Sequence, residues 1–401
     1  MHKHVFLMKI AVLAAVLFAV PAVLQAQFDF TVGGDQVQVH SFASQGYAYS
    51  DHNNFLTMPT RTGSPAFTDG GFNMSTSLTD KLRVGAQLYF RNVGQLGKWQ
   101  PELDWGYVDY RFKSWFGVRG GKVKSALGLY NDTQDMDSMQ TFALLPQGVY
   151  PLDLRDDYIA HTGGDVYGQV SFHKGGNLRY TAYGGARESN PRGGYYYSTA
   201  SDGMPITSMS GLVVGGDLRW ETPVRGLTIG LSQLGQTVDV HAEVLAMGGL
   251  PLDVQYRSPN EITAAYGDYA IGQWHFTGEF RRNKEVPETT VYGVTAYSDL
   301  SDKGWFLTAA YRFNKTLEFG TYTSHYYVSQ PATPDPAANH ISDEAVTLRF
   351  DLTKFWYAKV EAHFMDGYGS PLTAHGFYSA VNPDGLNPTT NMAVVRTGFS
   401  F

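Results

Sequence analysis

The charged side chains of this chain form two sets that differ in sign and placement. The acidic set gathers in one stretch and comprises Asp132, Asp135, Asp137, Asp153, Asp156 and Asp157. The basic set is spread along the chain, and it comprises Arg83, Arg91, Arg119, Arg179, Arg187, Arg219, Arg281, Arg312, Arg349 and Arg396. Clustered carboxylates can bind a hard cation. If they face a basic surface, the two sets of charges produce an electric field between them.

Motifs for catalysis or for a cofactor are missing from the sequence. His241 and Glu243 lack the second histidine of a zinc helix, and the chain has neither a Walker loop nor a GxGxxG after a strand. The segment 230–235 has the wrong spacing for a nucleophile elbow. Asp135 and Asp137 would suit calcium, but acidic loop residues are more often solvated. We therefore predict no catalytic residue, no metal and no cofactor.

The segments that carry the arginines alternate apolar and polar side chains. In residues 82–91 one face holds Leu82, Val84, Ala86, Leu88 and Phe90, and the other holds Arg83, Gln87, Tyr89 and Arg91. The same alternation occurs in residues 178–187, 212–221, 274–281, 305–313, 346–352 and 356–364. A transmembrane strand has about 9–11 residues and alternates lipid-facing with lumen-facing side chains. Repeated charges at mid-strand favour a membrane barrel over a soluble sandwich, and helical periodicity is almost absent.

Two segments alternate less regularly, and both are still predicted as strands. In residues 37–50, Gln45 falls on the apolar face. In residues 102–112, aromatic side chains occupy both faces.

Short and long connections follow one another in the alternation expected of periplasmic turns and extracellular loops. The predicted short turns are residues 79–81, 113–114, 174–177, 222–226, 271–272, 314–316 and 353–354. The predicted long loops are residues 51–69, 125–163, 188–210, 236–258, 284–302, 329–342 and 367–389, with a shorter one at 94–101. Residues 289–298 are interpreted as a hairpin arm of an extracellular loop, because counting them as a wall strand breaks the alternation. The pattern predicts an all-β, antiparallel, up-and-down transmembrane barrel of about sixteen strands with both termini periplasmic.

The N-terminus has the order of a secretory signal peptide. Lys3 and Lys9 precede an apolar run from Ile10 to Val20, and Pro21 and Ala26 close the segment. The run is shorter than the roughly 20 residues of a membrane helix. We predict a signal peptide at 1–26 and a single barrel domain at 27–401.

Composition supports an exported barrel. The chain has no cysteine, 44 glycines, 26 tyrosines and 24 phenylalanines, which suits aromatic belts around a polar interior. Loss of two lysines with the signal changes the net charge from −7 to −9, and this charge argues against nucleic acid as a partner.

The last strand carries a specific C-terminal pattern. Val395, Thr397, Phe399 and Phe401 share one face, and Arg396 lies on the other. A terminal amphipathic strand that ends in phenylalanine resembles the signal by which the barrel-assembly machinery receives outer-membrane proteins. We therefore predict that machinery and outer-membrane lipid as partners, and the cell outer membrane as the location.

A family resemblance follows from two stretches between residues 103 and 170. Residues 119–133 (RGGKVKSALGLYNDT) and 145–153 (LPQGVYPLD) resemble bacterial outer-membrane porins of the sixteen-stranded general or specific type. In those proteins a strand with an arginine runs into a Gly-Leu-Tyr-Asn turn and a long loop folded into the pore. The resemblance implies that loop 125–163 is an inward-folded constriction loop. It also implies a homotrimer.

The resemblance and the width of such a barrel together imply a water-filled channel for passive diffusion of small hydrophilic solutes or ions. The expected constriction residues are Asp132, Asp135, Asp137, Arg83, Arg119, Arg179, Arg219, Arg312, Arg349 and Arg396. Among them Arg83, Arg119 and Arg179 are expected to face the acidic edge, because their strands lie near the origin of the loop. Two alternatives stay open. One is a barrel-embedded outer-membrane hydrolase, whose Ser/His pair the spacing would not reveal, and the other is a structural or adhesion barrel that acts through its extracellular loops.

Overall fold

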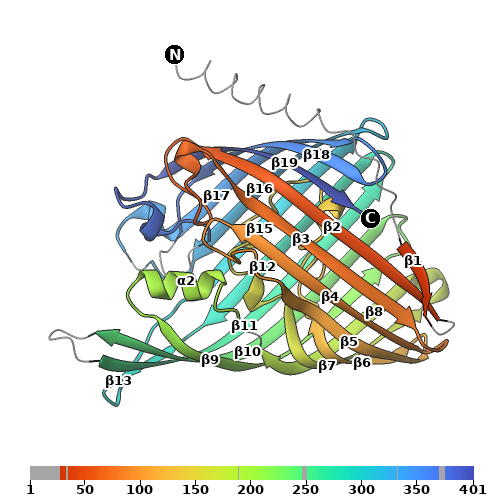
Figure 1. Ribbon diagram of the computed structural model, residues 1–401, viewed down its shortest axis with the longest axis horizontal. Helices are drawn as coiled ribbons and strands as arrows, with labels where there is room; N and C mark the ends of the chain where they lie inside the picture. Colours follow the sequence, from red (N-terminus) through yellow and green to blue (C-terminus); the bar gives the residue numbers. More distant parts are fainter. Residues whose placement is uncertain (1–27, 33–34, 188, 246–250, 332, 370–374) are drawn as a thin grey trace.

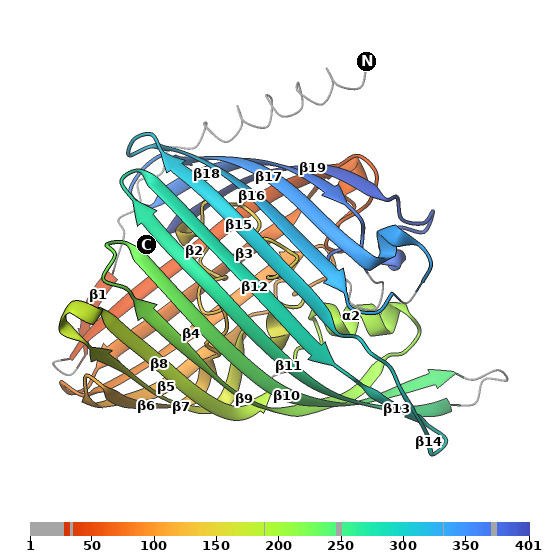
Figure 2. The ribbon, with the colours of Figure 1, turned by 180° about the vertical axis from the view of Figure 1, so that it is seen from behind.

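Sixteen antiparallel strands close into a barrel in the computed structural model, which describes residues 28–32, 35–187, 189–245, 251–331, 333–369 and 375–401 (Figures 1 and 2). Closure occurs where β19 (Thr389–Ser400) pairs with β2 (Asp35–Ser50), from Met392 opposite Ser50 to Ser400 opposite Phe42. The predicted fold class is confirmed. The predicted signal peptide lies outside the described residues.

Each remaining wall strand pairs with the next along the chain. They are β3 (Ser64–Ser77), β4 (Leu82–Val93), β5 (Glu102–Lys113), β6 (Phe116–Lys124), β7 (Ala160–Ser171), β8 (Asn177–Arg187), β9 (Ile206–Glu221), β10 (Leu227–Leu245), β11 (Pro251–Ile271), β12 (Trp274–Glu285), β15 (Asp302–Arg312), β16 (Leu317–Val328), β17 (His340–Asp351) and β18 (Trp356–Asp366). In addition β1 (Phe28–Val32), which the sequence analysis did not anticipate, pairs along the start of β2.

The predicted hairpin arm is also present. In this arm β13 (Glu288–Val291) pairs with β14 (Val294–Tyr297) and with β11, and in the wall β12 pairs directly with β15. Seven short turns join wall strands at one end of the barrel, where they were predicted, and the longer loops lie at the other end. These loops hold α2 (Gly194–Ser201) and the short helices η1 (Thr60–Thr62), η2 (Asp137–Met139), η3 (Arg155–Asp157), η5 (Pro336–Asn339) and η6 (Ser379–Val381), whereas η4 (His173–Gly175) lies in a short turn.

One predicted loop is wrong. Residues 236–258 were expected to connect two strands outside the wall, but β10 and β11 continue through most of this range and project past the rest of the wall (Figure 2). Their side chains still alternate with the polarity reversed, since Val238 and Val240 are buried on the inner face while Asp239 and Glu243 lie on the outer one. A strand extension outside the membrane has no lipid to face, so charges at outward positions are stable there.

The outer wall between the two rims is apolar, as the alternation predicted. In β4, Leu88 is 50% exposed while its neighbour Tyr89, which faces inward, is 1% exposed. Exposed apolar side chains recur on other strands at Val108, Leu212, Val214, Leu231, Leu307 and Phe364. No helix among the described residues is long and apolar enough to cross a membrane. A closed barrel with this outer band is built to stand in lipid.

The two irregular strands have local explanations. In β5 the register with β4 shifts so that Gln87 lies opposite Trp105 and Leu88 lies opposite Leu103. This bulge places the neighbours Asp104 and Trp105 together on the inner side, which is why aromatic residues occupied both faces of the pattern. On β2, the exposed Gln45 side chain donates to Pro65 O at 2.7 Å and accepts from Thr68 Oγ1 at 2.6 Å, so its polar groups are satisfied.

Candidate pore constriction

The connection between β6 and β7, residues 125–159, runs through the interior of the barrel (Figure 2). Near its start the backbone N–H of Gly128 donates to Ser232 Oγ at 2.9 Å, and that of Leu129 donates to Glu279 Oε2 at 2.8 Å. Farther along, the N–H of Ala143 donates to Glu361 Oε2 at 2.8 Å. The connection therefore reaches β10 and β12 with one part and β18 with another.

Asp137 lies on the β18 and β19 side of the lumen in a buried cluster of charges. Its Oδ1 is 2.8 Å from Lys359 Nζ and 3.3 Å from Arg396 Nη1. Burial acts to raise the pKa of Asp137, but the charges of Arg396 and Lys359 outweigh it, so the pKa lies below its usual range. The carboxylate therefore stays ionised and pins this part of the loop to two wall strands.

Asp135 lies toward the β4 and β5 side of the lumen. Its carboxylate is 2.6 Å from Lys124 Nζ and accepts from Gln87 Nε2 at 2.6 Å. Burial raises its pKa, but the charges of Lys124 and Arg155 lower it below the usual range. Arg155 in turn forms a buried ion pair with Asp104 at 2.6 Å.

Arg83, Arg119 and Arg179 were expected to face the acidic edge, and the hydrogen bonds and ion pairs that they form lie on the strand wall. Each has a nearer partner on its own or an adjacent strand, because cross-strand neighbours lie closer than the loop. Arg83 donates to Ser75 Oγ at 2.8 Å, Arg119 pairs with the directly opposite Asp165 at 2.8 Å, and Arg179 pairs with Glu221.

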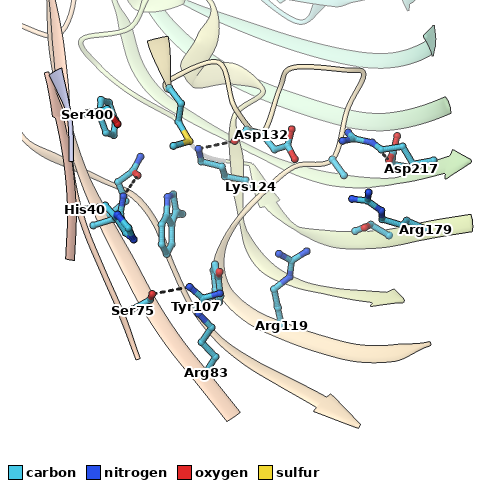
Figure 3. A pocket seen from close by; sticks show the side chains of 18 of the residues that line it. His40, Ser75, Arg83, Tyr107, Arg119, Lys124, Asp132, Arg179, Asp217 and Ser400 are labelled. Carbon is cyan, nitrogen blue, oxygen red and sulfur yellow. Dashed lines mark hydrogen bonds and ion pairs between the residues drawn. The ribbon is translucent and has the colours of Figure 1, made fainter. Parts of the chain in front are cut away.

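These three arginines nevertheless share a cavity of about 550 Å³ with Asp132 (Figure 3). Lys124 and Arg219 also line it, and the Asp217 carboxylate lies beside Arg219 at 3.3 Å. Cationic side chains therefore outnumber carboxylates on this cavity.

The other predicted arginines contact the loop or flank it. Arg219 donates to Gly128 O at 3.1 Å, and Arg349 donates to Gln140 O and Ser138 O, at 2.5 and 2.8 Å. Arg312 pairs with Asp351 at 2.6 Å and also contacts Glu318. Arg396 joins the loop to the wall, since it donates to Ala143 O at 2.8 Å and pairs with Asp69 at 2.7 Å.

Sequence reasoning did not single out Lys124 and Lys359, which pair with the loop acids, or Glu279 and Glu361, which accept from its backbone. A signal was present for Lys359 and Glu361, because they share the inward face of β18 with His363. The Lys124 pairing depends on how the loop folds after β6, which residue spacing does not encode. No group of three or more side chains suited to holding a metal occurs among the described residues.

A closed strand wall, an apolar outer band and a charged interior define a transmembrane β-barrel of the outer-membrane type. The chain is thus an outer-membrane protein.

No protein-family model and no curated protein sequence matches the chain. Among solved structures it is similar to the outer-membrane-expressed OmpT of Vibrio cholerae, with a TM-score of 0.57 and 11% identity over 93% of this chain and 100% of that one. A trimer form of in-vitro folded OmpT has a TM-score of 0.51 and 9% identity, over 94% of this chain and 100% of that one.

Two similar structures are described as a channel and a porin. The outer-membrane channel DcaP of Acinetobacter baumannii has a TM-score of 0.56 and 10% identity, over 94% of this chain and 100% of that one. The anion-selective porin from Comamonas acidovorans has a TM-score of 0.52 and 13% identity, over 92% of this chain and 100% of that one. At such identities the likeness concerns the fold.

Proposed function

We propose that this chain is a porin, a water-filled channel for passive diffusion of small hydrophilic solutes or ions. The observation that carries the proposal is the charged interior of a sixteen-strand wall, with connection 125–159 running through it. A wall of this size is too wide for its own side chains to fill. Rings of charged side chains in a confined aqueous path set ion preference.

The narrowest part of the channel is proposed to lie at this connection. Asp132, Asp135 and Asp137 supply its acidic side, and the predicted arginines supply the basic wall, joined by Lys124 and Lys359. Opposed charges in a confined space act more strongly than in bulk water, so polar solutes would be oriented as they pass.

The chain is further proposed to work as a homotrimer after removal of residues 1–26. The similar OmpT has a trimer form, and the exposed Ala182 and Ala186 on β8 give a flat outer surface for close packing. The barrel-assembly machinery would receive the chain through β19 and Phe401.

Planar-bilayer recording tests the channel proposal. We expect purified, folded protein to give discrete, ohmic conductance steps in symmetric salt. A heat-denatured sample serves as the control and should give none. Folded barrel that inserts into the bilayer without conducting would overturn the proposal and favour the adhesion or structural alternative.

The hydrolase alternative meets a physical obstacle at one serine–histidine contact. Ser125 Oγ lies 3.0 Å from His161 Nδ1, but the two side chains are 2% and 0% exposed. A nucleophile needs access to its substrate, and this hydroxyl has none. Ser125 is therefore no candidate nucleophile, and any ester or peptide hydrolysis measured in detergent should be unchanged in a Ser125→Ala variant.

A further inference from the structure

A second cavity, of about 400 Å³, lies in the barrel at the long-loop end. The extended strands β9 to β11 form one side of it, and α2 contributes Tyr195 and Ser198 to another. The connection 125–159 contributes Leu154 and Tyr158. A solute that enters from the long-loop side would meet this cavity beside the proposed constriction.

The part of the cavity near the strand tips is apolar. Val238, Val240 and Ala242 follow one another on the inner face of β10. Met209 lies opposite Val240 on β9, and Val254 lies opposite Ala242 on β11. In this extension of the strands the alternation is reversed, so aliphatic side chains face the lumen. Along the rest of the wall polar side chains face the lumen.

Farther into the barrel the lining becomes acidic, with Glu285 on β12 and Asp302 on β15. Asn283 lies on β12 between the two carboxylates, and its Nδ2 donates to Asp302 Oδ2 at 3.0 Å and to Glu285 Oε2 at 3.3 Å. Neither carboxylate forms an ion pair with a cation among the described residues. The cations that line the cavity are engaged elsewhere, since Arg187 pairs with Asp157 at 2.6 Å and Arg281 with Glu279 at 3.3 Å.

Buried acceptors on the same lining lack a donor. Asn283 Oδ1 and Asn260 Oδ1 have no hydrogen-bond partner, and the two residues are 7% and 4% exposed. The Asn283 amide turns its Nδ2 toward Asp302 and Glu285, so its Oδ1 points away from both carboxyl groups. Arg281 Nε, a donor, also lacks an acceptor. Buried polar atoms are normally satisfied, so the two asparagine oxygens point to a group that arrives with hydrogen-bond donors.

We propose that this cavity binds small organic ammonium ions with an apolar body, as a recognition site on the solute path. The three N–H groups of the ammonium would donate to Glu285, Asp302 and one of the two asparagine oxygens, while the apolar body packs against Val238, Val240 and Val254. The charged end of such a molecule matches the acidic end of the cavity, and its apolar body matches the aliphatic end. The proposal rests on the channel function and adds a solute class to it.

Titration calorimetry with the folded protein in detergent tests the proposal with benzylammonium as the probe. Methylammonium lacks the apolar body, and benzyl alcohol lacks the charge, so we expect each to bind about tenfold or more weakly than benzylammonium. Equal affinity for methylammonium and benzylammonium would overturn the role of the apolar lining. Equal affinity for benzyl alcohol would overturn the role of the carboxylates.

Variants locate the binding. Glu285→Gln together with Asp302→Asn keeps the shape and removes the charge, and it should weaken benzylammonium binding about tenfold or more. Asp253→Asn, on the outer face of β11 where the carboxylate is 61% exposed, is the matched control and should leave binding unchanged. Unchanged benzylammonium affinity in the double variant would contradict the proposed site. An equal loss of affinity in the control variant would also contradict it. Wild-type conductance without the probe tests the channel itself, so the two failures are distinguishable.

Discussion

At the scale of single residues, the interior is organised by charge pairs that sequence spacing only partly indicates. The arginines were found because each interrupts an apolar pattern, and those named as site residues lie in the lumen or its rim. The cationic partners of the loop acids were not found, because that pairing depends on the fold of the loop. Asp137 meets Lys359 and Arg396 from strands more than two hundred residues away in the sequence.

Neutralising the loop acids tests the proposed constriction. Replacing Asp132, Asp135 and Asp137 with asparagine leaves Lys124, Lys359 and nearby arginines in excess, so selectivity should shift toward anions. The reversal potential in a salt gradient across a planar bilayer measures this. Asp239→Asn, on the outer face of β10, is the control. If the triple variant conducts and its reversal potential is unchanged, the loop does not form the constriction.

The same ion pairs also carry stability. The single change Asp137→Asn leaves Lys359, which is 0% exposed, without its carboxylate. Breaking a buried pair in this way costs about 3–5 kcal/mol. The Asp137→Asn variant should therefore lose its heat-resistant form at a lower temperature than wild type. Asp132→Asn should have little effect on that temperature.

A pH effect is expected at Asp157 in the loop. Burial raises the pKa of its carboxyl to about 6, although Arg187 acts in the opposite direction. The group therefore takes up a proton as pH falls through 6, and the lumen gains one positive charge. Because the unfolded carboxyl titrates near pH 4, this group favours the folded state increasingly as pH falls from about 6 to about 4. Cation preference should fall between pH 7.5 and 5, and Asp157→Asn should show a smaller change over that interval.

At the scale of elements, the strands and short turns were predictable because a lipid face imposes a strict period of two. The exceptions have separate causes. The extension of β10 and β11 was taken for a loop because its polarity is reversed, and the β5 bulge hid one inward face. The short β1 was not predicted, because its five residues are too few to show an alternation. It pairs with the start of β2.

The last strand is predicted to matter for assembly through its final residue. The N–H of Phe401 donates to Ser41 O at 2.8 Å, and its ring stacks on Phe355 at 5.6 Å between centroids. Deleting Phe401 should lower the yield of folded barrel in the outer membrane. Phe364→Ala, on the exposed outer face of β18, is the matched control for loss of an aromatic ring. Equal yields for the deletion and wild type would contradict the proposed role of Phe401 as an assembly signal.

At the scale of the whole molecule, the barrel presents an unbroken strand wall and a broad apolar outer surface. A trimer would bury part of that surface, and small side chains on β8 would allow close approach. We expect a native mass of three chains in mild detergent by light scattering, and one chain after boiling. A single-chain mass before heating, with full conductance, would contradict the proposed trimer.

Arg396 lies at the seam where the barrel closes. Its guanidinium, on β19, donates to Ser44 on β2, pairs with Asp69 on β3 and also holds the loop at Asp137 and Ala143. One side chain thus ties the end of the wall to its beginning and to the segment that crosses the interior. Arg396 can make all of these contacts at once only when the first and last strands are paired. Closure of the wall and anchorage of the interior loop therefore share one side chain, so a change at Arg396 would affect both at once.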